Sequence, residues 1–209
     1  MVDFQSRDRR RDRGTTEEDD ESEAESADTT DDEPAVAETD EVTDYDPETL
    51  PFGVVTVTAD RTIDEDATGD IVVDAIETAG DAVATRELLA PSYDGVQSAL
   101  TTLAERADVE AIVTVGGTGV EPDDVTVDAA EALFDKHLPG FGELFRVLSH
   151  EQEGTATIRT RTTAGIIDGV PVFCLPGETV AARRGVEQLV LEEAETLADQ
   201  ASDDEDTPD

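Results

Sequence analysis

Several residue types that mark common protein classes are scarce in this chain of 209 residues. Cys174 is the only cysteine, which excludes an internal disulfide and a cysteine-rich metal site. The two histidines, His137 and His150, lack the close spacing of a histidine metal site. No apolar run approaches 18 residues, and the N-terminus has no apolar signal core. We therefore expect a soluble cytoplasmic protein without a membrane partner.

Basic residues are scarce as well. The chain has 14 Lys and Arg against 54 Asp and Glu, a formal net charge of -40, and Lys136 is its only lysine. Such a surface repels nucleic acid, which we do not expect as a partner. The acidity is spread along the predicted helices, which favours a salt-rich cytoplasm. Dissolved ions screen the repulsion between the acids there, because the Debye length is about 3 Å at 1 M salt. An acidic partner-binding protein in ordinary salt is the alternative.

The composition divides the chain into three parts. Residues 1–49 contain 20 acidic and five basic residues and almost no apolar clusters, so this acidic arm is predicted to be disordered. Residues 200–209 form a second acidic tail, also predicted to be disordered. Residues 50–199 are long enough to bury one core. The arm could bind a partner, a hypothesis that deletion of residues 1–48 tests; we expect activity and assembly to survive the deletion.

Hydrophobic periodicity within residues 50–199 predicts an alternation of strands and helices. Strands are predicted at 52–58, 82–89, 111–115 and 170–175, and helices at 69–79, 94–106, 127–134, 141–148, 153–164 and 179–199. Strands separated by helices of about a dozen residues are typical of parallel sheets covered on both faces. The predicted fold class is therefore α/β, a three-layer α/β/α sandwich with a mostly parallel sheet.

A glycine-rich turn follows the predicted strand 111–115 and is the main candidate site. Glycines lack a Cβ, so a ligand can approach the backbone amides, and Thr126 offers an N-cap for the next helix. Two familiar phosphate loops are excluded, because no lysine follows the glycines and Pro122 stands where a dinucleotide fingerprint needs a third glycine. A tight turn without a ligand is the alternative. The turn consists of Gly116, Gly117, Thr118 and Gly119.

Further motifs follow the turn in a fixed order. They are Asp124-Val125-Thr126, Leu138-Pro139-Gly140-Phe141-Gly142-Glu143-Leu144-Phe145-Arg146, Leu148-Ser149, Gly154-Thr155, Thr160-Arg161, Ala164-Gly165 and Leu175-Pro176-Gly177. Together with the glycine turn, they resemble the MoaB/Mog family of molybdenum-cofactor biosynthesis proteins over roughly residues 51–198.

This resemblance implies both a fold and a reaction. Family members are α/β/α sandwiches that form homotrimers, or homohexamers built from trimers. Catalytic members are molybdopterin adenylyltransferases, which transfer the AMP part of ATP to the terminal phosphate of molybdopterin with Mg²⁺ and release pyrophosphate. The product then receives molybdenum or tungsten. A non-catalytic pterin-binding or scaffold protein of the same fold is the alternative.

The resemblance also implies roles for particular residues. Asp124 matches the essential acid after the glycine turn, and Asp94 loosely matches a second acid; both are expected in catalysis and Mg²⁺ binding. Carboxylates suit Mg²⁺, which takes one or two of them beside substrate phosphates. A helix cap or a solvated surface acid is the alternative for each. The four residues of the glycine turn are expected to bind substrate through their amides.

Two further segments are expected to contact substrate. Pro176 and Gly177 resemble the family's second loop near the pterin, and Arg161 keeps the guanidinium of a family motif. An ion pair at a subunit interface is the alternative for Arg161. Glu178 stands where the family commonly has serine, and an acid at that position repels a phosphate.

Overall fold

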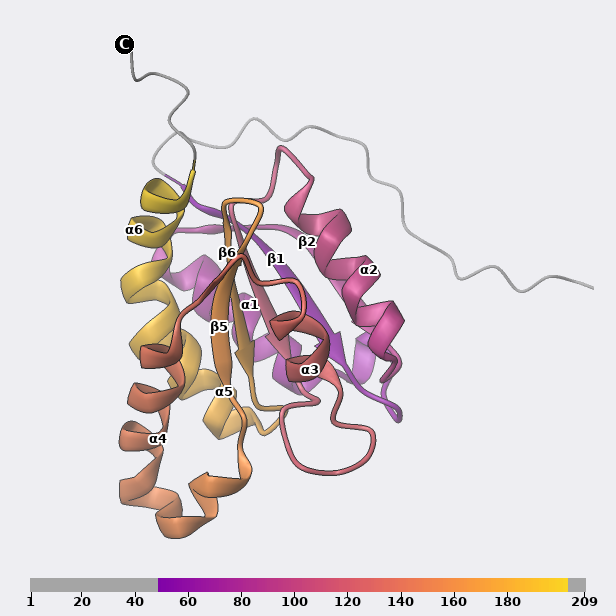
Figure 1. Ribbon diagram of the computed structural model, residues 1–209, viewed down its shortest axis with the longest axis vertical. Helices are drawn as coiled ribbons and strands as arrows, with labels where there is room; N and C mark the ends of the chain where they lie inside the picture. Colours follow the sequence, from indigo (N-terminus) through magenta and orange to yellow (C-terminus); the bar gives the residue numbers. More distant parts are fainter. Residues whose placement is uncertain (1–48, 203–209) are drawn as a thin grey trace, which may run out of the picture. The chain divides into compact units, whose positions relative to one another are not determined.

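The structure is a computed structural model, and it describes residues 49–202 (Figure 1). The predicted acidic arm lies outside the described residues except for Thr49, and the predicted acidic tail lies outside them except for residues 200–202. The last helix extends through Ala201, two residues into the range predicted as tail.

One six-stranded sheet forms the middle layer, in the order β2-β1-β3-β6-β5-β4. The four strands from β2 to β6 are parallel, whereas β5 and β4 are antiparallel to their neighbours, which confirms a mostly parallel sheet. The strands are β1 (Pro51–Val57), β2 (Ala82–Leu89), β3 (Ala111–Val115), β4 (Lys136–His137), β5 (Thr163–Ile167) and β6 (Val170–Leu175).

Helices cover both faces of the sheet and complete the predicted three layers (Figure 1). α1, α4, α5 and α6 bury apolar residues against one face, and α2 and α3 do so against the other. The helices are α1 (Ala67–Ala79), α2 (Tyr93–Ala104), α3 (Thr126–Glu131), α4 (Pro139–Glu153), α5 (Thr179–Gly185) and α6 (Leu191–Ala201). Shorter helical segments are η1 (Ile63–Glu65), η2 (Gly154–Arg159) and the π-helical η3 (Val186–Val190).

The central strands are apolar on both sides because both of their faces are covered. In β1, Val54 packs into the core under α1 and α5, while the next residue, Val55, packs into the core under α2. In β3, Val113 packs into the same core as Val54, and Ile112 packs into the same core as Val55. This alternation follows from the two-residue repeat of a strand.

The predicted helix at 153–164 is wrong. The segment forms the short 3-10 helix η2, and Thr163 then begins β5, which pairs antiparallel with β6. The hairpin turn is Asp168-Gly169, in which both residues have positive φ, 47° and 84°. Asp-Gly between two apolar runs is a strong hairpin signal that periodicity alone does not detect.

Thr126 is not the N-cap of α3, which corrects a second prediction. The helix begins at Thr126 itself, Val125 occupies the cap position, and no side chain caps the helix. The hydroxyl of Thr126 is buried without a hydrogen-bond partner in the described part of the chain, because it packs beneath the glycine turn. At α1, by contrast, Asp66 does cap the helix and accepts from the amide of Gly69 at 3.0 Å.

Among residues 49–202, none of the helices combines the length and the apolar composition that a bilayer crossing requires.

Candidate active site

A pocket of about 720 Å³ lies where β1, β3 and β6 end. Open α/β sheets bind ligands at this carboxyl edge because the loops that leave parallel strands converge there. The pocket brings together the glycine turn, Asp124 and the second loop. Its lining residues are Val57, Thr58, Arg61, Gly116, Gly117, Thr118, Gly119, Val120, Glu121, Asp124, Glu153, Ala156, Arg159, Thr160, Pro176, Gly177 and Glu178.

The glycine turn has a backbone that only glycine adopts without strain. Gly116 and Gly117 have φ angles of 97° and 65°. A Cβ on Gly116 would overlap the carbonyl oxygen of Val57, and one on Gly117 would overlap the hydroxyl of Thr126. The turn therefore packs directly on the ends of β1 and α3, and this packing fixes its position.

Three amides of the turn remain without a protein acceptor. The amide of Gly116 donates to the carbonyl of Leu175 at 3.0 Å, so it is already occupied, contrary to the prediction that all four amides serve a ligand. Within residues 49–202, the amides of Gly117, Thr118 and Gly119 donate no hydrogen bond. Amides exposed in a pocket are suited to anionic oxygens.

Asp124 lies half-buried beside these amides. Its Oδ2 accepts from the amide of Glu121 at 2.8 Å, and its carboxylate is packed against Gly119. Its Oδ1 has no protein partner among the described residues. One oxygen of Asp124 thus holds the loop in shape, and the other is available to a cation in the pocket.

The second loop touches the glycine turn directly. A Cβ on Gly177 would lie 3.3 Å from the Cα of Gly116. The carbonyl of Gly177 accepts from the hydroxyl of Thr68 at 3.0 Å, and this hydroxyl also lies 3.1 Å from that of Thr179. The structure thus brings Pro176 and Gly177 into the same pocket as the glycine turn.

Asp94 lies elsewhere. It is an exposed residue in the first turn of α2, and it does not line the pocket that contains Asp124. Ser92 is the N-cap of this helix, because its hydroxyl accepts from the amide of Gly95 at 3.2 Å. Within one chain, the two predicted acids are therefore not brought together, and the role of Asp94 stays a prediction.

Arg161 contacts the loop from outside the pocket lining. Its Nε donates to the carbonyl of Gly119 at 2.6 Å, and Nη2 donates to the carbonyl of Asp124. Nη1 donates to both carboxylate oxygens of Asp128 at 2.9 and 2.8 Å. In the structure Arg161 therefore ties the glycine turn to α3, and a contact with substrate stays a prediction.

The family described as a probable molybdopterin binding domain matches residues 49–196. The chain belongs to the MoaB/Mog family.

Curated relatives and solved structures agree with this membership. Molybdenum cofactor biosynthesis protein B of Halalkalibacterium halodurans is 36% identical over 148 residues, which are 70% of this chain and 87% of the relative. A molybdopterin adenylyltransferase of Pyrococcus furiosus is 37% identical over 152 residues, 70% of this chain and 88% of the relative. A crystal structure of a molybdenum cofactor biosynthesis protein B has a TM-score of 0.72 at 31% identity and covers 75% of this chain and 98% of its own.

This MoaB/Mog protein also contains a buried carboxylate, Asp66, which was not among the predicted site residues. Asp66 is completely buried and accepts from Thr56 Oγ1 at 2.6 Å, from the amide of Gly69 at 3.0 Å and from Arg86 at 3.0 Å. Burial raises its pKa, but these hydrogen bonds outweigh burial and hold the pKa below its ordinary value. The sequence feature that could have indicated a buried hydrogen-bond acceptor is Thr56, a polar residue near the end of the buried strand β1.

Asp66 also stabilises the elements that form one wall of the pocket. Through Arg86 it joins β2 to the start of α1. Thr68, two residues further along, reaches the second loop at Gly177. The buried network of Asp66 therefore fixes the N-terminus of α1, and α1 in turn holds one wall of the site.

Cys174 is excluded as a nucleophile. It is completely buried in β6, and burial raises its pKa to about 12.

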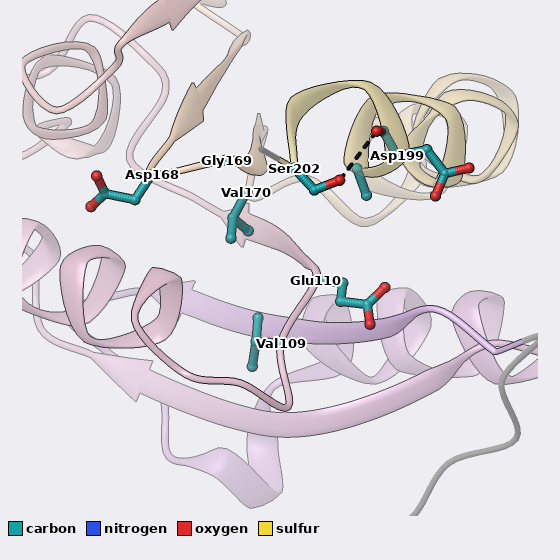
Figure 2. Close-up of a pocket in the computed structure, with 8 residues that line it drawn as sticks. Val109, Glu110, Asp168, Gly169, Val170, Asp199 and Ser202 are labelled. Carbon is teal, nitrogen blue, oxygen red and sulfur yellow. Dashed lines mark hydrogen bonds between the residues drawn. The ribbon is translucent and has the colours of Figure 1, made fainter. Parts of the chain in front are cut away.

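A second hollow, of about 510 Å³, lies at the opposite edge of the sheet in this family member (Figure 2). Its acids do not converge, since the side chains of Asp168 and Asp199 point away from each other. The hydrogen bond drawn there runs from the hydroxyl of Ser202 to the carbonyl of Asp199 at 3.1 Å. No group of three acidic, histidine or cysteine side chains in residues 49–202 is placed to hold a metal ion. The hollow lacks the features of a catalytic centre.

Substitution of Gly116 tests the requirement for a bare backbone in the turn. We expect Gly116→Ala to lower the free energy of unfolding by about 2 kcal/mol, because the new Cβ meets the Val57 carbonyl at a positive φ. Urea unfolding measures this change. Gly140→Ala is the matched control, since no atom lies within 4 Å of its added Cβ. Equal stability of the two variants would contradict the described turn.

Proposed function

We propose that this protein adenylylates molybdopterin with Mg²⁺ and ATP and releases pyrophosphate. The observation that carries the proposal is the set of three amides, at Gly117, Thr118 and Gly119, that lie beside Asp124 Oδ1; none of these four groups has a partner among residues 49–202. The relative from Pyrococcus furiosus that is named molybdopterin adenylyltransferase supports the same reaction.

The transfer requires two anionic groups to meet. An oxygen of the terminal phosphate of molybdopterin attacks the α-phosphorus of ATP, a new P–O bond forms, and the bond to the β-phosphate breaks. The electron pair leaves with pyrophosphate. The three amides would donate to phosphoryl oxygens, where negative charge develops in the transition state. Pro176 and Gly177 would place the pterin on the other side of the turn.

Asp124 fits a magnesium ion that is shared with substrate phosphates. Mg²⁺ keeps several waters and takes one or two carboxylates, so a protein cage of three acids is not needed. When bound, the ion would supply charge neutralisation for the phosphates. Asp124 Oδ1 would hold it, while Oδ2 keeps the loop in place. Asp94 remains a second candidate carboxylate.

A non-catalytic pterin-binding protein is the second candidate, and one residue favours it. Glu178 lines the pocket next to Gly177, and its charge repels the triphosphate of ATP more strongly than the single phosphate of molybdopterin, because the triphosphate carries more negative charge. Glu121 also lines the pocket and adds to the negative charge, whereas the carboxylate of Glu153 pairs with Arg184 at 3.0 Å. Binding without transfer is the expected behaviour if the triphosphate cannot enter.

The assembly we propose is a homotrimer, or a hexamer of two trimers. Large apolar side chains are exposed on α4 and η2, namely Leu144, Val147 and Ile158, and Ile158 is 77% exposed. Exposed apolar groups of this size on one segment favour burial against another copy. Sedimentation in molar salt measures the assembly, and a monomer would contradict it.

We also propose a cytoplasmic location and no nucleic-acid or membrane partner. The net charge of -40 supports a surface adapted to concentrated salt. Assays are therefore best carried out in molar salt.

Pyrophosphate release decides between the two candidates. Purified protein is mixed with molybdopterin, ATP and Mg²⁺ in molar salt, and samples without molybdopterin serve as the control. We expect release that depends on molybdopterin. Tight binding of molybdopterin without release would refute the transferase and support the pterin-binding protein.

A further inference from the structure

Most basic side chains in the part of the chain that the structure describes have an acidic partner. Residues 49–202 contain nine basic residues, and six of them form ion pairs. Lys136, Arg146 and Arg159 form none in this part of the chain. Of these three, Arg159 alone lines the pocket that contains the glycine turn. With acids so abundant, a guanidinium left unpaired at this position is available to an anion from outside.

The backbone beside Arg159 is tied to the glycine turn. Arg159 is the last residue of η2, and its side chain is exposed. Two residues later, the amide of Arg161 donates to the carbonyl of Thr118 at 2.8 Å. The chain two residues beyond Arg159 is therefore held at the Thr118 side of the turn, and Arg159 lines the same pocket.

Arg61 stands at the other side. It lies in the loop after β1, and its Nη1 donates to the hydroxyl of Thr68 at 3.4 Å. This hydroxyl in turn donates to the carbonyl of Gly177 in the second loop. The two arginines thus flank the turn, with Arg159 at its Thr118 side and Arg61 at its Gly177 side.

The ion pair of Arg61 is weak enough to leave its charge available. Its Nη1 lies 3.8 Å from Asp66 Oδ1, whereas Arg86 holds the same carboxylate at 3.0 Å. The side chain of Arg61 is also 41% exposed, while that of Asp66 is buried. Arg86 therefore neutralises Asp66, and the guanidinium of Arg61 is free to turn toward the pocket.

We propose that Arg61 and Arg159 form an arginine pair that binds the phosphoryl oxygens of a polyphosphate group over the glycine turn. A guanidinium matches the oxygens of a phosphate with two parallel hydrogen bonds, and it keeps its charge at any physiological pH. Two guanidinium groups also offset much of the negative charge of Glu121, Asp124 and Glu178, the acids of the pocket lining that have no basic partner among residues 49–202. The inference rests on the proposed function for the ligand class, but it concerns binding and does not require transfer.

Binding of magnesium pyrophosphate, measured by calorimetry in molar salt, tests the pair. We expect Arg159→Gln to raise the Kd about tenfold, since a hydrogen bond to a charged group contributes at least one such factor. Arg61→Gln is expected to have a similar effect. Arg183→Gln is the matched control, because Arg183 is an exposed arginine on α5 that pairs with Glu187 outside the pocket, and its Kd should stay unchanged.

The outcomes separate this inference from the proposed reaction. Absence of pyrophosphate binding by the unmodified protein, or an unchanged Kd for Arg159→Gln, would overturn the arginine pair. The side chain of Arg159 makes no hydrogen bond or ion pair within residues 49–202, so its replacement should not unfold the protein, and melting curves check this. Arginine-dependent binding without pyrophosphate release from ATP would support the pair and refute the transferase.

The same variants identify which substrate supplies the phosphate. Titrations with magnesium ATP and with molybdopterin are run in parallel on the unmodified protein and on Arg159→Gln. A tenfold loss for ATP alone assigns the pair to the triphosphate. A tenfold loss for molybdopterin alone would contradict a polyphosphate site, because molybdopterin carries a single phosphate, and an unchanged Kd for both would contradict the pair.

Discussion

Replacement of Asp124 by alanine is expected to lower the rate of pyrophosphate release by about 100- to 1000-fold, the usual effect of removing one group that stabilises the transition state. Asp124 is half-buried in the pocket, and its Oδ1 has no partner in residues 49–202. The substitution removes a magnesium ligand next to the phosphate-binding amides. The rate is measured with saturating ATP and molybdopterin, and sedimentation checks that the assembly is intact.

Two variants separate the charge of Asp124 from its role in the loop. Asp124→Asn keeps an oxygen that can accept from the Glu121 amide but removes the charge. We expect it to be nearly as inactive as the alanine variant. Asp123→Ala, at the exposed neighbouring position, is the matched control and should stay active. An active Asp124→Ala protein would remove Asp124 from the reaction. Asp94→Ala should show a comparable loss only if Asp94 acts in the same site.

Asp66→Ala is expected to lower the free energy of unfolding by about 4 kcal/mol, the range found when one partner of a buried ion pair is removed. Its loss leaves the buried hydroxyl of Thr56 without its acceptor and removes the buried carboxylate that Arg86 Nη2 contacts, although Arg86 keeps Asp70. The matched control is Asp70→Ala. Asp70 pairs with the same arginine at 2.7 Å but is 56% exposed, so we expect a loss below about 1 kcal/mol. Urea unfolding compares the two variants, and equal losses would contradict the buried network.

The buried network also makes a prediction about pH. Because the folded protein holds the pKa of Asp66 below its ordinary value of 3.8, the stabilisation is present in full above that value. It is lost as the pH falls through the lower pKa of the folded state. The stability of the unmodified protein should therefore fall more steeply below about pH 4 than that of Asp66→Asn, which does not titrate. Parallel slopes in urea unfolding at pH 3 to 6 would contradict this.

The elements that the sequence predicted best are those with strong periodicity. The ranges for β2, β3 and β6 agree with the structure residue for residue; β3 and β6 are apolar runs between clear breaks, whereas β2 contains Arg86 and Glu87. β5 was missed because its five residues follow a segment without a clear period, and its pairing with β6 depends on the Asp168-Gly169 turn. β4 has only two residues, too few for any pattern.

The site was predictable where it follows from local chain geometry. The glycine turn, Asp124 and the second loop meet because all of them follow strands that end at one edge of a parallel sheet. Contacts between distant segments were not predictable. No local sequence pattern indicates that the Gly116 amide donates to the carbonyl of Leu175. The same holds for the hydrogen bond from the Arg161 guanidinium to the carbonyl of Gly119.

A crystal structure with magnesium and a non-hydrolysable ATP analogue, grown in molar salt, tests the role of the glycine turn most directly. The account predicts phosphoryl oxygens within hydrogen-bond distance of the Gly117, Thr118 and Gly119 amides, with the metal ion on Asp124. Phosphates bound elsewhere on the protein, with these three amides facing only solvent, would contradict it.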